Sequence, residues 1–180
     1  MNIYRLKVTL VGGPPWSSPN TWRTIEIKGS QTLDRLHRAI FRAYERWEEH
    51  LYSFYMSRDR GDGSQEYAAP GLFEDNDFPL GGKPRHAAST RLDQLGLTAG
   101  RKFSYMFDYG DGWEHKVEVL SIKQQEPEGR YPRIIETHGE SPPQHGEWNE
   151  GEEDYGEEEG EDEEPVRGRV IPLWGQPDDA

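Results

Sequence analysis

Aromatic and polar side chains alternate most clearly in residues 103–122. The first half of this stretch places aromatic side chains at every second position: Phe103, Tyr105 and Phe107. The second half places Val117 and Val119 on one face of an extended chain. Between the halves, residues 108–112 are rich in Asp and Gly, which turns prefer. The pattern predicts a β-hairpin, around which we expect the rest of the domain to be organised.

The same two-residue period predicts three further strands. They lie at residues 3–11, 22–28 and 50–57. In the first of them Tyr4, Leu6, Val8 and Leu10 share one face, which indicates a strand with one buried side. We therefore expect strands 3–11, 22–28, 50–57, 102–108 and 113–122 to form one sheet.

Residues 32–47 change to the period of a helix. The apolar positions with this spacing are Leu33, Leu36, Ile40, Tyr44 and Trp47. Thr32 is a suitable N-cap, and Asp34 in the first turn suits the helix dipole. We expect this helix to lie across the sheet with Leu33, Leu36, Ile40 and Trp47 buried.

Three remaining stretches have weaker patterns. Residues 57–89 are rich in Gly, Pro, Asp and Ser and are predicted to form a long surface loop. Residues 91–97 predict one short helical turn, and residues 131–135 a short extended piece. The predicted fold is a single α+β domain with a mixed or antiparallel sheet and one main helix. Its order of elements is like that of β-grasp domains.

Charge divides the chain into a body and a tail. The 180 residues carry a net charge of −13, but 11 of the 34 acidic residues fall in residues 150–164, which hold no basic residue. Such a block cannot collapse, so we predict a domain at residues 1–147 followed by a disordered acidic linker at 148–165.

The C-terminal residues 166–180 have a different composition from the linker. They begin with the apolar and basic sequence VRGRVIPLW. We predict that this tail is a docking segment that can add to a sheet edge. The acidic block itself has two interpretations, a solvating tail or a decoy for basic and nucleic-acid-binding partners.

Several classes of protein are disfavoured by composition. The chain has no cysteine, which excludes disulfides and thiolate chemistry. It shows neither a signal peptide nor an apolar run of membrane-spanning length, so we expect a cytoplasmic protein without a membrane segment. Nucleophile-elbow and phosphate-loop motifs are absent from the sequence.

Direct nucleic-acid binding is not expected. The arginines of segment 32–47 (Arg35, Arg38, Arg42 and Arg46) follow a helical face, but acidic residues are interleaved with them. This arrangement favours a solvated, ion-paired surface over a phosphate-binding one.

The tip of the central hairpin is the densest group of aromatic and ionisable residues. It contains Asp108, Asp111, Trp113, Glu114 and His115, and His50 is a further candidate. In one interpretation Asp108, Asp111 and His115 bind a divalent metal, because carboxylate oxygen and imidazole nitrogen are suitable ligands. In the other, the aspartates cap backbone N–H groups of the turn and Trp113 packs on the helix. The histidines at 37, 86, 138 and 145 have no spacing that indicates a site.

Five segments of the chain carry a family resemblance. They read TWRTIEI, TLDRLHRAIFRAYERW, HLYSFYM, LDQLGLTAGRKFSYMFDYGDGWEHKVEV and, further on, YP at 131–132 with PP at 142–143. Together they resemble the plasmid pRiA4b ORF-3-like family, also called MM3350-like domains, over residues 1–146. The resemblance implies a compact α+β domain of bacteria, archaea and mobile elements without an established activity.

One part of the chain departs from the family pattern. The family continues after the double proline with an acidic pair, a cysteine and two glycines, whereas residues 142–147 read PPQHGE here. The acidic pair and the cysteine are missing, so a role that they have elsewhere is not expected in this chain.

Two hypotheses of function follow. The first is a non-enzymatic interaction or binding module that recognises an unidentified protein partner and needs no cofactor. The second is a metal-dependent hydrolase or nuclease that uses Asp108, Asp111 and His115.

Overall fold

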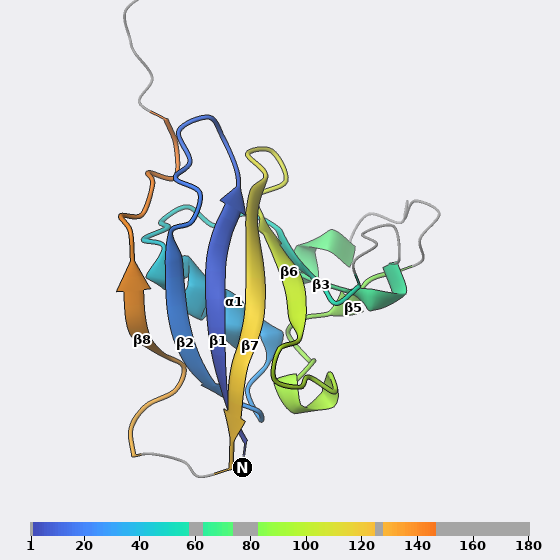
Figure 1. Cartoon of the computed structure of the whole chain (residues 1–180). Coiled ribbons are helices and arrows are strands. Elements are labelled where there is room, and N and C mark those ends of the chain that lie inside the picture. The colour runs from blue at the N-terminus through green and yellow to red at the C-terminus, as the bar shows by residue number, and fades with distance from the viewer. Residues whose placement is uncertain (1, 58–62, 74–82, 125–127, 147–180) are drawn as a thin grey trace, which may run out of the picture. The chain divides into compact units, whose positions relative to one another are not determined.

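Eight strands form one sheet in the computed structural model, which describes residues 2–57, 63–73, 83–124 and 128–146 (Figure 1). Their order across the sheet is β5-β4-β3-β6-β7-β1-β2-β8. The bounds are Ile3–Gly12 (β1), Trp22–Lys28 (β2), Tyr52–Tyr55 (β3), Glu66–Ala68 (β4), Arg85–His86 (β5), Lys102–Phe107 (β6), Trp113–Lys123 (β7) and Arg133–His138 (β8). Neighbouring strands are antiparallel except β4 and β5, which are parallel. The α+β class and the five-strand sheet predicted from the sequence are confirmed.

The predicted hairpin is the β6–β7 pair, and β1 lies on the other side of β7. The alternating face of β1 is fully buried, and so are Phe103, Tyr105 and Phe107 of β6. Burying apolar area at about 25 cal/mol per Å² makes this alternation the main determinant of the register.

Helix α1, Leu33–Ala43, covers one face of the sheet (Figure 1). Thr32 caps it as predicted, since its hydroxyl oxygen accepts a hydrogen bond from the Arg35 N–H at 3.3 Å. Leu33, Leu36 and Ile40 are buried against the sheet. The apolar stripe of the helix and the inner faces of the strands therefore form one core.

The helix ends four residues earlier than predicted. Glu45 adopts a left-handed conformation, with φ of 55°. The Arg46 N–H then bonds the Phe41 carbonyl at 3.0 Å and the Glu45 N–H bonds the Arg42 carbonyl at 3.1 Å, which is a Schellman ending without its usual glycine. The prediction that Trp47 is buried is wrong, because this ending turns its side chain outward and leaves it 70% exposed.

Part of the predicted loop at residues 57–89 belongs to the sheet. Strands β4 and β5 extend the sheet beyond β3, with 3₁₀ turns at Gly63–Gln65 and Pro70–Phe73. Ala68 and Ala87 are completely buried there. Strands of three and two residues are too short to show a period, so no pattern in the sequence predicts them.

Two short predicted elements are present. The helical turn expected in residues 91–97 is a 3₁₀ turn at Leu92–Gln94. The extended piece expected at residues 131–135 continues as β8, which pairs with β2 and forms an edge of the sheet.

The chain divides into two compact units, Met1–Gly146 and Glu147–Ala180. The second unit lies outside the described residues, as do the predicted acidic linker 148–165 and docking segment 166–180. In the described part of the chain no helix has the length and apolar character needed to span a bilayer.

Candidate functional site

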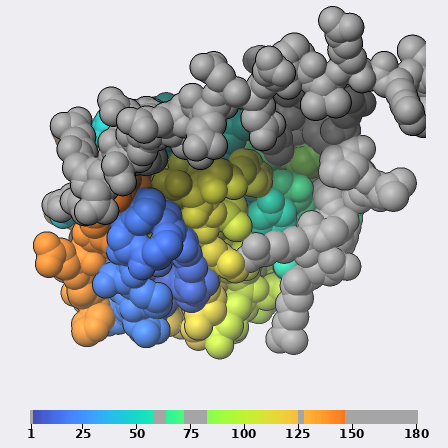
Figure 2. All heavy atoms as spheres, turned by 90° about the horizontal axis from the view of Figure 1, so that it is seen from above, coloured from blue at the N-terminus to red at the C-terminus, as the bar shows by residue number. Residues whose placement is uncertain are grey.

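Four chain segments meet at one end of the sheet. They are the β1–β2 loop, residues 44–51 after α1, the β6–β7 turn at residues 108–112, and residues 139–146 after β8. Figure 2 looks onto this end, where the blue β1–β2 region lies between the orange residues near β8 and the yellow residues of the β6–β7 hairpin. Loops that meet at one end of a rigid sheet are where binding residues are commonly placed.

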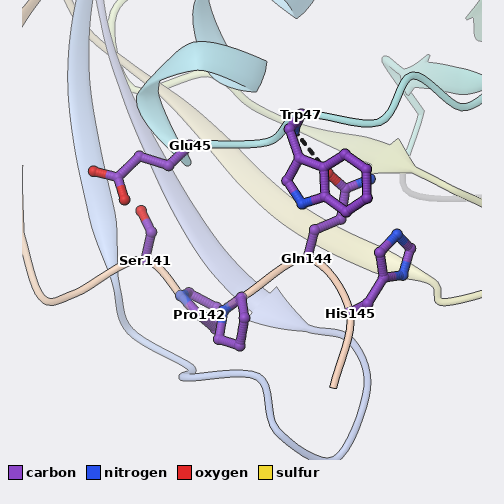
Figure 3. Close-up of a pocket in the computed structure, with 7 residues that line it drawn as sticks. Glu45, Trp47, Ser141, Pro142, Gln144 and His145 are labelled. Carbon is purple, nitrogen blue, oxygen red and sulfur yellow. Dashed lines mark hydrogen bonds between the residues drawn. The ribbon is translucent and has the colours of Figure 1, made fainter. Parts of the chain in front are cut away.

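Residues 139–146 are held in place by buried polar side chains. Gln144, which is 3% exposed, makes three hydrogen bonds to the segment after α1. Its Oε1 accepts from the N–H group of Trp47 at 2.9 Å (Figure 3). The same Oε1 accepts from the Glu48 N–H at 3.1 Å, and Nε2 donates to the Glu48 carbonyl at 2.8 Å. The next residue, His145, is thereby fixed beside Glu48.

Arg46 provides a second tie between the same two segments. Its Nη1 donates to the Pro142 carbonyl at 3.0 Å, and its guanidinium lies 3.7 Å from the centre of the Trp113 ring. Burial lowers the pKa of Arg46 to about 10, while the charges of Tyr105, Tyr44 and Asp111 act in the opposite direction. The sequence predicted that Arg46 lies on a solvated helical face, but in the structure it is buried.

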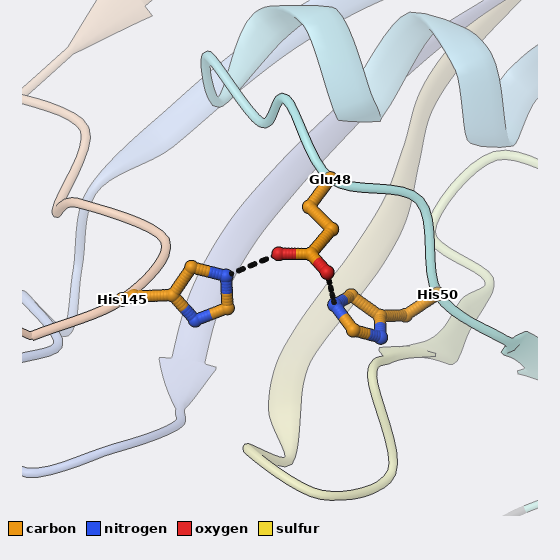
Figure 4. Close-up of side chains that lie close together, drawn as sticks. All are labelled: Glu48, His50 and His145. Atoms are coloured by element: carbon orange, nitrogen blue, oxygen red, sulfur yellow. Dashed lines mark hydrogen bonds and ion pairs between the residues drawn. The ribbon is translucent and has the colours of Figure 1, made fainter.

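Glu48, His50 and His145 form a cluster at this end of the sheet (Figure 4). The Glu48 carboxylate lies between the two imidazoles, with Oε2 2.9 Å from His145 Nε2 and Oε1 3.8 Å from His50 Nε2. One ligand atom from each of the three residues lies within 4.8 Å of the other two. The side chains are 47%, 32% and 34% exposed, so the cluster opens to solvent.

Two of the predicted site residues, Asp108 and Asp111, border this cluster. Asp108 has φ of 56°, and its Oδ1 accepts hydrogen bonds from the N–H groups of Gly110 at 2.9 Å and Asp111 at 3.4 Å. The Oδ2 atom of Asp108 lies 3.6 Å from His50 Nε2, and that of Asp111 lies 3.7 Å from His145 Nδ1. Asp108 therefore caps the turn and also adds negative charge beside the histidines.

His115 and Trp113 lie in the core and not at the cluster. His115 is 1% exposed and packs between the rings of Tyr44 and Tyr105, with centroid distances of 4.8 and 5.3 Å. Burial, followed by the charge of Arg46, lowers the pKa of His115 to about 3. Glu114, half-buried, pairs with Gly12 in the strand register. In the described part of the chain, no hydrogen bond or ion pair joins His115 to Asp108 or Asp111.

Of the predicted residues, His50 is the one that belongs to the cluster, and Glu48 and His145 were not singled out. Glu48 and His50 are two positions apart, so an extended segment places both on one side. This spacing is a local signal from which Glu48 and His50 could have been predicted to act together. His145 is 97 residues from Glu48, and no pattern in the sequence relates the two.

A shallow cavity of about 300 Å³ adjoins the cluster at His145 (Figure 3). It is lined by Glu45, Trp47, Ser141, Pro142, Pro143, Gln144 and His145. The ring of Trp47 stands edge-on to His145 with a centroid distance of 5.4 Å. An exposed aromatic side chain thus lies next to the cluster.

Comparison with known proteins gives a family and a fold. The family model described as "Plasmid pRiA4b ORF-3-like protein" matches residues 2–167. "Uncharacterized protein y4hQ" of Sinorhizobium fredii (strain NBRC 101917 / NGR234) is 31% identical over 144 residues, which cover 79% of this chain. The chain spans 66% of that relative's length. The crystal structure of "Protein of Unknown Function MM3350" from Methanosarcina mazei Go1 has a TM-score of 0.61 and 22% identity, covering 79% of this chain and 72% of its own.

Proposed function

This chain belongs to the plasmid pRiA4b ORF-3-like family, and from that premise we propose that it is a non-enzymatic binding module. Its ligand is one divalent transition-metal ion, held by Glu48, His50 and His145. The relatives described above are named as uncharacterised or of unknown function, so the proposal is based on the site itself.

The observation that carries the proposal is the spacing of the ligand atoms. Atoms that bind zinc at about 2.0–2.1 Å in a tetrahedron are roughly 3.3 Å apart. The Glu48 oxygens lie 2.9 Å from His145 Nε2 and 3.8 Å from His50 Nε2, so both distances are within about 0.5 Å of that value. The ligand atoms of the three residues lie within 4.8 Å of one another, so side-chain rotations that bring the two histidines closer would close the cluster around an ion.

The hydrogen bonding of His50 also supports a role as a metal ligand. Its Nε2 atom is buried and has no hydrogen-bond partner among the described residues, although Glu48 and Asp108 oxygens lie 3.8 and 3.6 Å away. A buried nitrogen without a partner is costly, and a bound cation would satisfy its lone pair.

The donor set favours zinc over harder ions. Two imidazole nitrogens and one carboxylate oxygen suit Zn²⁺ and also Co²⁺ or Ni²⁺, whereas Mg²⁺ and Ca²⁺ prefer oxygen ligands throughout. The absence of cysteine leaves histidine as the strongest zinc ligand that this chain offers.

A metal-dependent hydrolase is the second candidate. Its specific support is that three protein ligands leave a coordination position for water, as in catalytic zinc sites. Binding is favoured over catalysis because the three side chains are a third to a half exposed, whereas an active site usually shields its reacting groups from bulk water.

Metal titration of the untagged full-length protein tests the proposal. After EDTA treatment and its removal, isothermal calorimetry with Zn²⁺ should give one site per chain, and Co²⁺ should give the visible spectrum of nitrogen ligation. The spectrum matters because the acidic residues 150–164 can also attract cations, but only through oxygen.

Matched histidine variants identify the ligands. His50→Ala and His145→Ala should each remove the Zn²⁺ site, whereas His86→Ala, in β5, should retain it. Wild-type protein that gives no nitrogen-ligated Co²⁺ spectrum, or a His145→Ala variant that binds like wild type, overturns the proposal. Hydrolysis of an activated phosphate diester or ester by the Zn²⁺-loaded protein, lost in His145→Ala, would favour the hydrolase instead.

A further inference from the structure

We infer that Asp111 is a positioning residue, which orients His145 for metal binding; this inference rests on the proposed metal site. Asp111 accepts the Nδ1 proton of His145 and so stabilises the tautomer whose Nε2 atom is free to bind the ion. A histidine that binds a metal through one nitrogen generally donates from the other, and the acceptor fixes both the tautomer and the ring orientation.

The two nitrogens of His145 face two different carboxylates. Nε2 lies 2.9 Å from Glu48 Oε2, and Nδ1 lies 3.7 Å from Asp111 Oδ2. Because Glu48 and His50 share the side of the ring that carries Nε2, this nitrogen is the one placed to bind the ion. Nδ1 must then keep the proton, and Asp111 is the acceptor beside it.

The hydrogen bonding of the Asp111 carboxylate indicates that this residue has a role outside the turn. Its Oδ2 atom is buried and has no hydrogen-bond partner among the described residues. A buried carboxylate oxygen without a donor is unfavourable. A shift of about 1 Å would bring His145 Nδ1 within hydrogen-bond distance and satisfy it.

The hairpin turn and Arg46 place this carboxylate. Asp108 bonds the Asp111 N–H through its side chain, and the Asp108 carbonyl accepts from the Gly112 N–H at 2.7 Å. On the inner side, the buried guanidinium of Arg46 interacts electrostatically with Asp111. The carboxylate is therefore held by the turn and interacts electrostatically with a buried cation as well as with the imidazole.

Metal binding consequently selects one tautomer of His145. The Nε2 atom of His145 lies 2.9 Å from Glu48 Oε2, so without an ion an ionised Glu48 favours a proton on Nε2. When an ion takes the lone pair of Nε2, a proton on Nε2 leaves to solvent and Nδ1 holds or takes up one proton from solvent, so that the ring is the neutral Nδ1–H tautomer whose proton Asp111 accepts. The tautomer of His145 is thus a direct readout of the inference.

The test compares Asp111→Ala, Asp111→Asn and wild type in the full-length protein, with Zn²⁺ as the probe. Asp111→Ala should weaken Zn²⁺ binding by roughly 10–100-fold, the range seen when such partners are removed. Asp111→Asn keeps a neutral acceptor and should lie between Asp111→Ala and wild type. Asp93→Ala, which removes an exposed ion pair with Arg91, is the control and should bind Zn²⁺ like wild type.

Nitrogen NMR of ¹⁵N-histidine-labelled protein supplies a readout that a purely structural role would not change. Zn²⁺ should convert His145 to the Nδ1–H tautomer in wild type, and less completely in Asp111→Ala. If Asp111→Ala unfolds in EDTA, the comparison uses Asp111→Asn alone. Unchanged Zn²⁺ affinity in the folded variants, with wild type binding normally, overturns this inference only. Wild type that does not bind Zn²⁺ overturns the proposed function.

Discussion

Gln144 and Glu48 are joined by two hydrogen bonds, one in each direction, although they lie 96 residues apart. The Glu48 N–H donates to Gln144 Oε1 at 3.1 Å, and Gln144 Nε2 donates to the Glu48 carbonyl at 2.8 Å. The pair aligns the segment that carries Glu48 and His50 with the segment that carries His145. This buried amide, together with Arg46, therefore brings the three side chains of the cluster to one place.

Replacing Gln144 with Ala should loosen the cluster as well as the fold. Three hydrogen bonds are lost, each with a net value of about 0.5–1.5 kcal/mol, so we expect the free energy of unfolding to fall by about 1.5–4.5 kcal/mol. Zn²⁺ affinity should fall at least about tenfold, because His145 is no longer held in place. Urea unfolding and calorimetry measure the two effects.

Gln31 offers a matched control for that experiment. It also joins two backbone segments, accepting from the Lys28 N–H at 3.1 Å and donating to the Tyr131 carbonyl at 2.9 Å. Gln31→Ala should lower stability without changing Zn²⁺ affinity. Equal losses of affinity in the two variants would show that general destabilisation, and not alignment, explains the result.

The turn at the hairpin tip depends on Asp108. The sequence suggested that Asp108 and Asp111 both cap backbone N–H groups, but the capping oxygen is Asp108 Oδ1. Asp108→Ala should lower stability by about 1–2 kcal/mol, because it removes these bonds and places Ala at φ of 56°. Asp108→Asn keeps an acceptor and tolerates this φ, so thermal unfolding in EDTA should show a much smaller loss. Equal losses in the two variants would contradict the capping role.

The sheet could be predicted because the alternation of apolar and polar residues along its longer strands indicates which face of each strand is buried. Leu6, Val8 and Leu10 alternate with polar residues over a long strand, and the hairpin turn has the Asp and Gly composition of a turn. The helix end could not be predicted, because the left-handed residue is Glu45 and not glycine. Local composition carries no signal for a Schellman ending made by a residue that also favours helices.

Only part of the candidate site could be predicted from the sequence, because some of its residues are brought together by contacts between distant segments. Asp108 and Asp111 could be predicted because they lie in a dense local cluster of ionisable residues, to which His50 was added as a further candidate ligand. His145 joins them through contacts made by Gln144 and Arg46 across about a hundred residues. His115 was grouped with the aspartates by proximity in sequence, but the two-residue period of β7 turns it into the core with Trp113.

Acid should destabilise the domain through its buried histidines. His37 is stacked on Tyr52 with a centroid distance of 3.7 Å, and its Nδ1 lies 2.8 Å from the Tyr105 hydroxyl oxygen. Burial lowers the pKa of His37 from 6.5 to about 4, although the charge of Asp34 acts in the opposite direction. The folded state therefore keeps this imidazole neutral at pH values where the unfolded chain protonates it.

The sign of the pH dependence follows from that difference. Between pH 6.5 and about 4 the unfolded state binds more protons at His37 than the folded state, so stability falls as the pH is lowered through this range. The stabilising contribution is complete above pH 6.5, and the slope is at most about 1.4 kcal/mol per pH unit for each such histidine. His115, with a pKa of about 3, adds a second contribution of the same sign.

Urea unfolding at several pH values between 6.5 and 4.5 measures this slope in metal-free protein. His37→Gln should be less stable at neutral pH, since it loses the stacking on Tyr52, but its stability should depend less steeply on pH than that of wild type. His86→Gln, at an exposed position in β5, should keep the wild-type slope. A slope in His37→Gln equal to that of wild type would show that His37 is not the neutral buried group that resists acid, and would assign the effect to His115 and the carboxylates.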